Sequence, residues 1–158
     1  MKTIRIICIL LVCLWVAPVF AQDKPTDTTM EIVREAAKSN KRALVALNLQ
    51  LTEAEDKAFW PVYDSYQKVL GKITERLVSL IKDYAKEYKE KSLSDSKAQQ
   101  LVQDYLALEE DMTNLKKSYL KKFTAVIPAK KVMTYYQLEN KIQSIVKFDM
   151  AIEIPLAQ

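Results

Sequence analysis

The chain has 158 residues, 49% of them hydrophobic and 28% charged, and a formal net charge of +4. It contains no histidine, one glycine and two cysteines, Cys8 and Cys13. Without histidine, the most common general base and metal ligand is missing, as is every Ser-His or Cys-His nucleophile. A single glycine is too few for glycine-rich phosphate loops and β-hairpin turns. We therefore expect an all-α protein that is not an enzyme and that binds no metal or cofactor.

The N-terminus has the features of an export signal. Lys2 and Arg5 precede an apolar run over residues 6–16, and small residues at positions 19 and 21 suit a signal peptidase. The run is shorter than the roughly 18–20 residues that span a bilayer, so residues 1–21 are predicted to be cleaved. Neither cysteine lies at the cleavage point, so a lipid anchor is not expected. The protein is predicted to be periplasmic.

The predicted mature chain is nearly neutral. Without Lys2 and Arg5, 22 of the 24 basic residues remain against 20 acids, which leaves a net charge of +2. A nucleic-acid-binding protein normally carries a strong excess of positive charge. Nucleic acid is therefore not an expected partner.

The mature chain is predicted to form one domain. Residues 22–29 are polar and include a proline, which predicts a disordered lead, and residues 30–156 are predicted to form a single all-α domain. A first helix is expected to begin at position 28 or 29 and to end near position 47. Its apolar side would consist of small and aliphatic residues at helical spacing.

A second helix is predicted to run from Thr52 to about Lys89. Thr52 and Glu55 have the spacing of a capping box, and Leu51 before them can act as a hydrophobic staple. Pro61 has no N–H group and crowds the preceding turn. Two alternatives follow: a kink within one continuous helix, or a short first helix followed by a new one.

A third and a fourth helix complete the predicted domain. Leu93 and Ser94 repeat the Leu-hydroxyl pair of the second helix start, and Ser94 is expected to cap a helix that ends near position 126. Pro128 suits the first turn of a fourth helix, which is expected to end before Pro155.

The two central helices carry matching heptad ladders. Steps of 4 and 3 residues place all members of a ladder on one stripe of a helix, as in helix-on-helix packing. The first ladder is Phe59, Tyr63, Tyr66, Leu70, Ile73, Leu77, Leu80 and Tyr84, and the second is Leu101, Tyr105, Leu108, Met112, Leu115, Tyr119, Lys122 and Val126. A short turn between them predicts a long antiparallel helical hairpin in which the numbers of paired residues sum to 185.

This seam alone would leave apolar surface uncovered. Partial second stripes include Val62 and Val69 on the second helix and Val102, Leu106 and Leu120 on the third. The central helices are also predicted to be longer than the first and fourth. A homodimer or an exposed concave face is therefore expected.

Two groups of residues are candidate partner-binding surfaces. Phe59, Trp60, Tyr63 and Tyr66 surround Pro61, and at helical spacing they suit a core, or alternatively a patch that grips apolar segments. The second group is basic and consists of Lys116, Lys117, Lys121 and Lys122, followed by Lys130 and Lys131. A solvated helix face explains it most simply; the alternatives are an acidic client or anionic lipid headgroups. Lys122 occupies a ladder position and is expected to extend past Tyr63 toward solvent.

The chain resembles the Spy/CpxP-like superfamily of exported bacterial proteins. Leu51-Thr52-Glu53-Ala54-Glu55 and Leu93-Ser94-Asp95-Ser96-Lys97 are similar to its two Leu-Thr-x-x-Gln motifs, although Glu55 replaces the glutamine. Phe59–Tyr63, Gln137–Lys141 and Glu153–Leu156 look like a branch of small exported proteins, some of which are described as sigma-factor sensors. The resemblance implies a bent helical hairpin, flanking helices and a cradle-shaped dimer.

The resemblance implies one of two non-catalytic functions. The first is an ATP-independent chaperone that holds partly unfolded clients on an apolar and basic face. The second is a signalling adaptor that binds an envelope sensor kinase or an anti-sigma protein. Phe59, Trp60, Val62, Val69 and the four clustered lysines are the predicted partner-binding residues.

Overall fold

The computed structural model describes residues 40–157, and every element in this range is helical. The helices are α2 (Lys41–Leu49), α3 (Glu53–Glu90), α4 (Asp95–Thr124) and α5 (Ala129–Glu153). This confirms the predicted all-α class. The predicted signal peptide, the polar lead and the start of the first helix lie outside the described residues. Between residues 40 and 157, no helix combines the length and apolarity that crossing a membrane requires.

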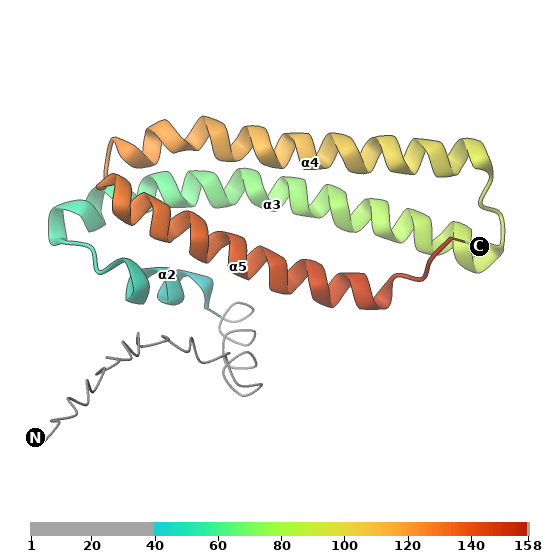
Figure 1. The fold of residues 1–158 in the computed structure, drawn as a ribbon, viewed down its shortest axis with the longest axis horizontal. Helices are drawn as coiled ribbons and strands as arrows, with labels where there is room; N and C mark the ends of the chain where they lie inside the picture. Colours follow the sequence, from blue (N-terminus) through green and yellow to red (C-terminus); the bar gives the residue numbers. More distant parts are fainter. Residues whose placement is uncertain (1–39, 158) are drawn as a thin grey trace, which may run out of the picture.

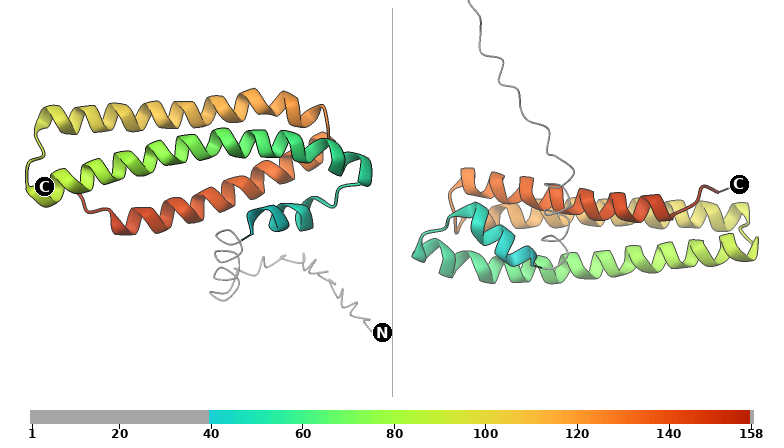
Figure 2. Two further views of the ribbon diagram at one scale, coloured as in Figure 1. Left: turned by 180° about the vertical axis from the view of Figure 1, so that it is seen from behind. Right: turned by 90° about the horizontal axis from the view of Figure 1, so that it is seen from below.

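The long helices lie side by side (Figure 1). α3 and α4 run antiparallel, and α5 returns along them in the direction of α3, so that it ends near the α3–α4 turn. The short α2 lies beside α5 at the opposite end, where α3 begins (Figure 2). We call the end near α2 the aromatic end and the end near the α3–α4 turn the turn end.

Side-chain caps fix the helix starts that the sequence predicted. The Thr52 hydroxyl accepts a hydrogen bond from the Glu55 N–H at 3.3 Å, and the Glu55 carboxylate accepts one from the Thr52 N–H at 2.8 Å. The Ser94 hydroxyl accepts from the Lys97 N–H at 3.2 Å. Each bond satisfies a backbone N–H that has no partner within the helix, so both predicted caps are confirmed.

The prediction of one continuous first helix was wrong. Asn40 lies within its expected range, but it is the N-cap of α2, with φ at −153° and a side chain that accepts from the Ala43 N–H. This extended backbone cannot continue a helix. α2 ends at Leu49, two residues later than expected, and Gln50 follows it in the left-handed conformation.

α3 passes through Pro61 as one helix, which excludes the split alternative. Pro61 is exposed, so its ring occupies the solvent side of the helix. The helix ends at Lys91, whose backbone is left-handed with φ at 52°. The Ser92 N–H donates to the Glu87 carbonyl at 3.0 Å, which closes the last turn of the helix.

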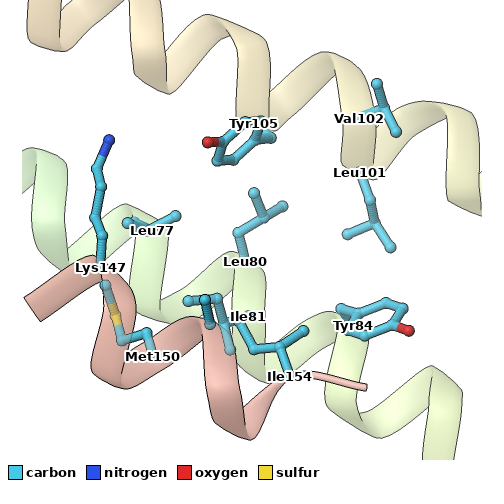
Figure 3. Close-up of a pocket in the computed structure, with 11 residues that line it drawn as sticks. Leu77, Leu80, Ile81, Tyr84, Leu101, Val102, Tyr105, Lys147, Met150 and Ile154 are labelled. Atoms are coloured by element: carbon cyan, nitrogen blue, oxygen red, sulfur yellow. The ribbon is translucent and has the colours of Figure 1, made fainter. Parts of the chain in front are cut away.

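The predicted register is correct at the positions where the structure shows it. The rings of Tyr66 and Tyr119 meet at 5.4 Å between centroids. At the turn end, Leu80 points toward Tyr105 and Tyr84 faces Leu101 (Figure 3). All three pairs have the predicted sum of residue numbers.

The second ladder departs from the prediction at its last turn. Lys122 is exposed and its ammonium lies 4.0 Å from the centroid of the Tyr119 ring, whereas Phe123 is fully buried. Phe123 meets Phe59 at 5.6 Å and Tyr66 at 5.8 Å between ring centroids. The expectation that Lys122 would lie in the seam against Tyr63 was therefore wrong.

The third long helix packs at some distance from α3. No Cα atom of α5 lies within 8 Å of a Cα atom of α3. At the aromatic end this gap is filled by rings, since Tyr135 contacts Phe59 at 5.5 Å and Tyr66 at 6.0 Å between centroids. At the turn end the facing residues are mainly aliphatic, such as Leu77, Leu80 and Ile81. The spacing that suits aromatic rings therefore leaves space there.

Candidate functional site

The turn end contains two apolar cavities between α3, α4 and α5 (Figure 3). The first, of about 420 Å³, opens between α3, α4 and the end of α5. The second, of about 540 Å³, lies between α3 and the end of α5. They are lined mainly by aliphatic and aromatic side chains, among them Leu77, Leu80, Ile81, Tyr84, Leu101, Val102, Tyr105, Val78, Val146, Met150 and Ile154. We call the two cavities together the turn groove.

The residue types on facing helices explain the turn groove. Leu80 and Leu77 of α3 are only half-buried, although they belong to the same ladder as the buried Phe59 and Tyr66. Across from them, α5 presents Ala151, which fills little volume. Apolar side chains that lack a partner remain attractive to other apolar groups. The turn groove can therefore accept an aliphatic segment of another molecule.

The turn end also carries exposed large apolar side chains. Val78, Val102 and Tyr105 line the cavities, and Tyr88, Phe148 and Ile152 lie outside them. Apolar patches of this kind on a small protein often mark interaction sites. The expected surplus of apolar surface is present, although α5 covers more of the hairpin than predicted because it reaches Tyr84.

The predicted aromatic patch is part of the core. Phe59 is fully buried and packs in a cluster with Tyr63 and Tyr66, so no partner can reach it in the folded protein. Trp60 is half-buried and is covered by Arg42, whose guanidinium lies 4.1 Å from the centroid of the indole ring. The core interpretation of this cluster is correct, and the partner-binding role of Phe59 was wrong.

The two predicted valine positions differ in accessibility. Val62 is half-buried and packs against the core cluster. Val69 is exposed and lies in a shallow depression with Arg76 and Asp111, which form an ion pair at 2.5 Å. Neither residue lines the turn groove. Of the predicted apolar positions, only Val69 lies on an open surface.

The basic residues lie together on the C-terminal half of α4, far from the turn groove. Lys117, Lys121 and Lys122 are exposed, and Lys116 is half-buried. Lys131, at the start of α5, has a different role: its ammonium donates to the Glu55 carboxylate at 2.7 Å and to the Gln50 carbonyl at 2.9 Å. Lys131 thus links the start of α5 to the start of α3. The capping motif thus serves both helix initiation and tertiary packing.

A buried polar network surrounds Glu139, and no local sequence pattern predicted it. This carboxylate is 2% exposed and receives four hydrogen bonds, from Lys41 at 2.6 Å, Gln143 at 2.9 Å, Gln67 at 3.1 Å and Tyr135 at 3.4 Å. The donors come from α2, α3 and α5. A buried charge is tolerated when it is paired and hydrogen-bonded in this way. The network joins three helices and leaves no coordination position open, so we interpret it as structural.

The tyrosines near this network resist ionisation. Burial, followed by the negative charge of Glu139, raises the pKa of Tyr63 to about 12. The same two causes raise the pKa values of Tyr66 and Tyr135 still further. These phenols therefore stay neutral at ordinary pH and belong to the buried core.

The outer face of α4 carries an exposed stripe whose two leucines are symmetric about Thr113. Leu106 and Leu120 lie seven residues before and after Thr113 and are 60% and 47% exposed. Between them, the exposed Glu110 precedes Thr113 and the exposed Lys117 follows it. When such a stripe meets a second copy in antiparallel orientation about Thr113, Leu106 faces Leu120 and Glu110 comes within one residue of the partner's Lys117. The stripe is therefore approximately complementary to itself.

The described residues, 40–157, contain no group of three or more His, Cys, Asp or Glu side chains that could hold a metal ion. Comparison of the chain with models of protein families, with curated proteins and with solved structures finds no match.

Proposed function

We propose that this chain is an exported, non-catalytic binding protein that holds apolar segments of partly unfolded polypeptides without ATP, in the manner of a Spy-like chaperone. The turn groove is the observation that carries the proposal. It is an open apolar surface on an otherwise well-packed helical protein, and several of its lining residues are exposed. The resemblance of the capping motifs to the Spy/CpxP-like superfamily supports the same function.

The size of the groove suits weak and reversible binding. Burial of one aliphatic side chain contributes about 1.5–3 kcal/mol. Cavities of about 420 and 540 Å³ hold only a few such side chains, and association itself costs several kcal/mol. We therefore expect affinities in the micromolar range and little sequence specificity, as a chaperone that releases its clients without ATP requires.

Suppression of aggregation tests the proposal. The mature protein should reduce the light scattering of a chemically denatured model protein at near-stoichiometric ratios, at both low and high salt. Ala151→Glu places a carboxylate at the mouth of the first cavity on an exposed position of α5, and it should weaken suppression severalfold. Ala54→Glu, on an exposed position at the start of α3, is the matched control and should have no effect.

The clients of the protein decide between a chaperone and a dedicated adaptor. Crosslinking from envelope extracts should capture many polypeptides with the unmodified protein and fewer with Ala151→Glu. If the protein failed to suppress aggregation at every salt concentration tested, the result would contradict a chaperone function. Capture of one stoichiometric envelope partner would instead favour a signalling adaptor that binds a sensor kinase or an anti-sigma protein.

We also propose that the working form is a homodimer built on the outer stripe of α4. The arrangement of Leu106, Glu110, Lys117 and Leu120 about Thr113 supports it. This stripe lies outside the α3–α4 seam, so its use would leave the hairpin intact. The two turn grooves of such a dimer would lie at opposite ends of the assembly, because the two copies of α4 run antiparallel.

A further inference from the structure

The end of α5 divides the turn groove into its two cavities. Four residues line both of them: Ile81 and Tyr84 from α3, and Met150 and Ile154 from the end of α5 and the segment that follows it. In Figure 3, Met150 and Ile154 lie against Ile81 and Tyr84. The cavities are therefore the two sides of a single apolar trough on α3, and the C-terminal segment crosses it.

This segment lies outside the helix and begins with an extended residue. Helix α5 ends at Glu153, and Ile154 has the extended backbone angles φ −96° and ψ 113°. The Ile154 side chain is half-buried in the trough. The Tyr84 hydroxyl donates to the carbonyl oxygen of Pro155 at 2.8 Å. One aliphatic side chain and one backbone carbonyl thus hold the segment.

These contacts are few, so the segment can be displaced. Leu156 is 86% exposed and adds little to the attachment. The Ile154 N–H donates to the Ala151 carbonyl at 3.4 Å, which is a weak closing bond for the helix end. Chain termini held by so few contacts open locally at low cost.

We propose that residues 154–157 form a displaceable strap and that the trough beneath it accepts an extended aliphatic segment of a partner polypeptide in its place. The seated strap shows which chemistry fits: an aliphatic side chain in the lining that Ile81 and Met150 share, and a backbone carbonyl that accepts from Tyr84. A backbone carbonyl is present in every polypeptide, so the site selects for extended apolar chain rather than for one sequence. The inference rests on the proposed function. It places client binding in the trough on α3 and makes residues 154–157 a segment of the same chain that competes with the client.

Binding of the chain's own tail sequence tests the strap. The probe is a fluorescent peptide of residues 152–158, Ile-Glu-Ile-Pro-Leu-Ala-Gln. The strap reduces the fraction of binding-competent molecules, so the mature protein without residues 154–158 should bind the peptide about tenfold more tightly than the intact mature protein. Tyr84→Phe in the shortened protein should weaken binding about fivefold, because one hydrogen bond is lost. Tyr88→Phe, which alters an exposed tyrosine with no such bond, is the matched control and should leave binding unchanged.

A second pair of variants keeps the chain at full length. Ile154→Asp should raise peptide affinity by loosening the strap, whereas Leu156→Asp, at an exposed position, should not. Equal affinity of the intact and shortened proteins, or no binding to the shortened protein, would overturn the strap. If the intact protein still suppressed aggregation in that case, the proposed function would stand. If the intact protein did not suppress aggregation, the proposed function would be excluded, regardless of the results with the tail variants.

Discussion

At the scale of single residues, the interior departs from a purely apolar core at one place. Glu139 is the only charged residue classed as buried among residues 40–157, and its carboxylate connects α2, α3 and α5. The Lys41 ammonium pairs with this carboxylate and also donates to the Gln67 side chain at 2.9 Å. The network therefore depends on the negative charge of Glu139. Loss of the carboxylate would leave several donors without an acceptor at once.

Replacement of Glu139 by alanine should therefore be strongly destabilising. Lys41 would lose its ion pair, and the amides of Gln67 and Gln143 would each lose a hydrogen bond. Breaking one side of a buried pair costs about 3–5 kcal/mol. Urea unfolding followed by circular dichroism measures the change. Glu153→Ala, at an exposed position of the same helix, should change the free energy of unfolding by less than about 0.5 kcal/mol. A loss below about 1 kcal/mol for Glu139→Ala would contradict the structural role of the network.

At the scale of helices, local signals were sufficient to place the starts of α3 and α4. The predicted starts at Thr52 and Ser94 agree with the structure because each cap is a contact between residues three positions apart. The hairpin register follows from the ladders and a short turn. The positions of α2 and α5 could not be predicted in the same way. Their packing depends on Lys41 and Glu139, which lie 98 residues apart and carry no local pattern.

Helix geometry explains why Phe123, and not the predicted Lys122, occupies the seam. A straight α-helix has 3.6 residues per turn, so a strict seven-residue ladder drifts by about 20° per heptad. Over the three heptads from Leu101 to Lys122 this drift accumulates to about 60°, and the next residue, Phe123, then lies closer to the core-facing side. The wrong assignment of Lys122 came from extending the heptad too far. A correction for drift would have identified Phe123 from the sequence.

The contact between α5 and the start of α3 should weaken in acid. The ammonium of Lys131 and the N–H of Thr52 hydrogen-bond the Glu55 carboxylate and lower its pKa below the ordinary value of 4.5. A carboxyl group with a lower pKa in the folded state stabilises the fold above its unfolded pKa, and this contribution is lost as the pH falls through the folded value. The stability difference between the unmodified protein and Glu55→Gln should thus have its full value at pH 7 and decrease as the pH falls below 4.5.

Thermal melts of both proteins between pH 7 and pH 3 measure this difference. Glu53→Gln is the matched control, since Glu53 is exposed and pairs only with Lys57 on the same helix. Its stability difference should be small throughout the range. A difference between the unmodified protein and Glu55→Gln that stays constant down to pH 3 would show that the Lys131 contact does not depend on the charge of Glu55.

At the scale of the whole molecule, the two ends have different packing and suit different roles. Large rings close the gap between α3 and α5 at the aromatic end, and the Glu139 network lies beside them. The turn end has aliphatic residues around a similar gap and keeps two cavities. Rigid packing at one end can therefore support an adaptable surface at the other. The outer stripe of α4 lies between these ends and is the proposed dimer interface.

Charge exchange on this stripe tests the proposed homodimer. In an antiparallel pair centred on Thr113, Glu110 comes within one residue of the partner's Lys117, and this contact occurs twice in each dimer. Glu110→Lys or Lys117→Glu alone would place like charges together and should weaken dimerisation about tenfold, as measured by sedimentation equilibrium. The double variant restores opposite charges with their positions exchanged and should recover most of the affinity. Glu90→Lys, at the exposed end of α3, should have no effect. A monomeric protein at every concentration tested, or a double variant no better than the single ones, would rule out this interface, because only the symmetric pairing predicts recovery.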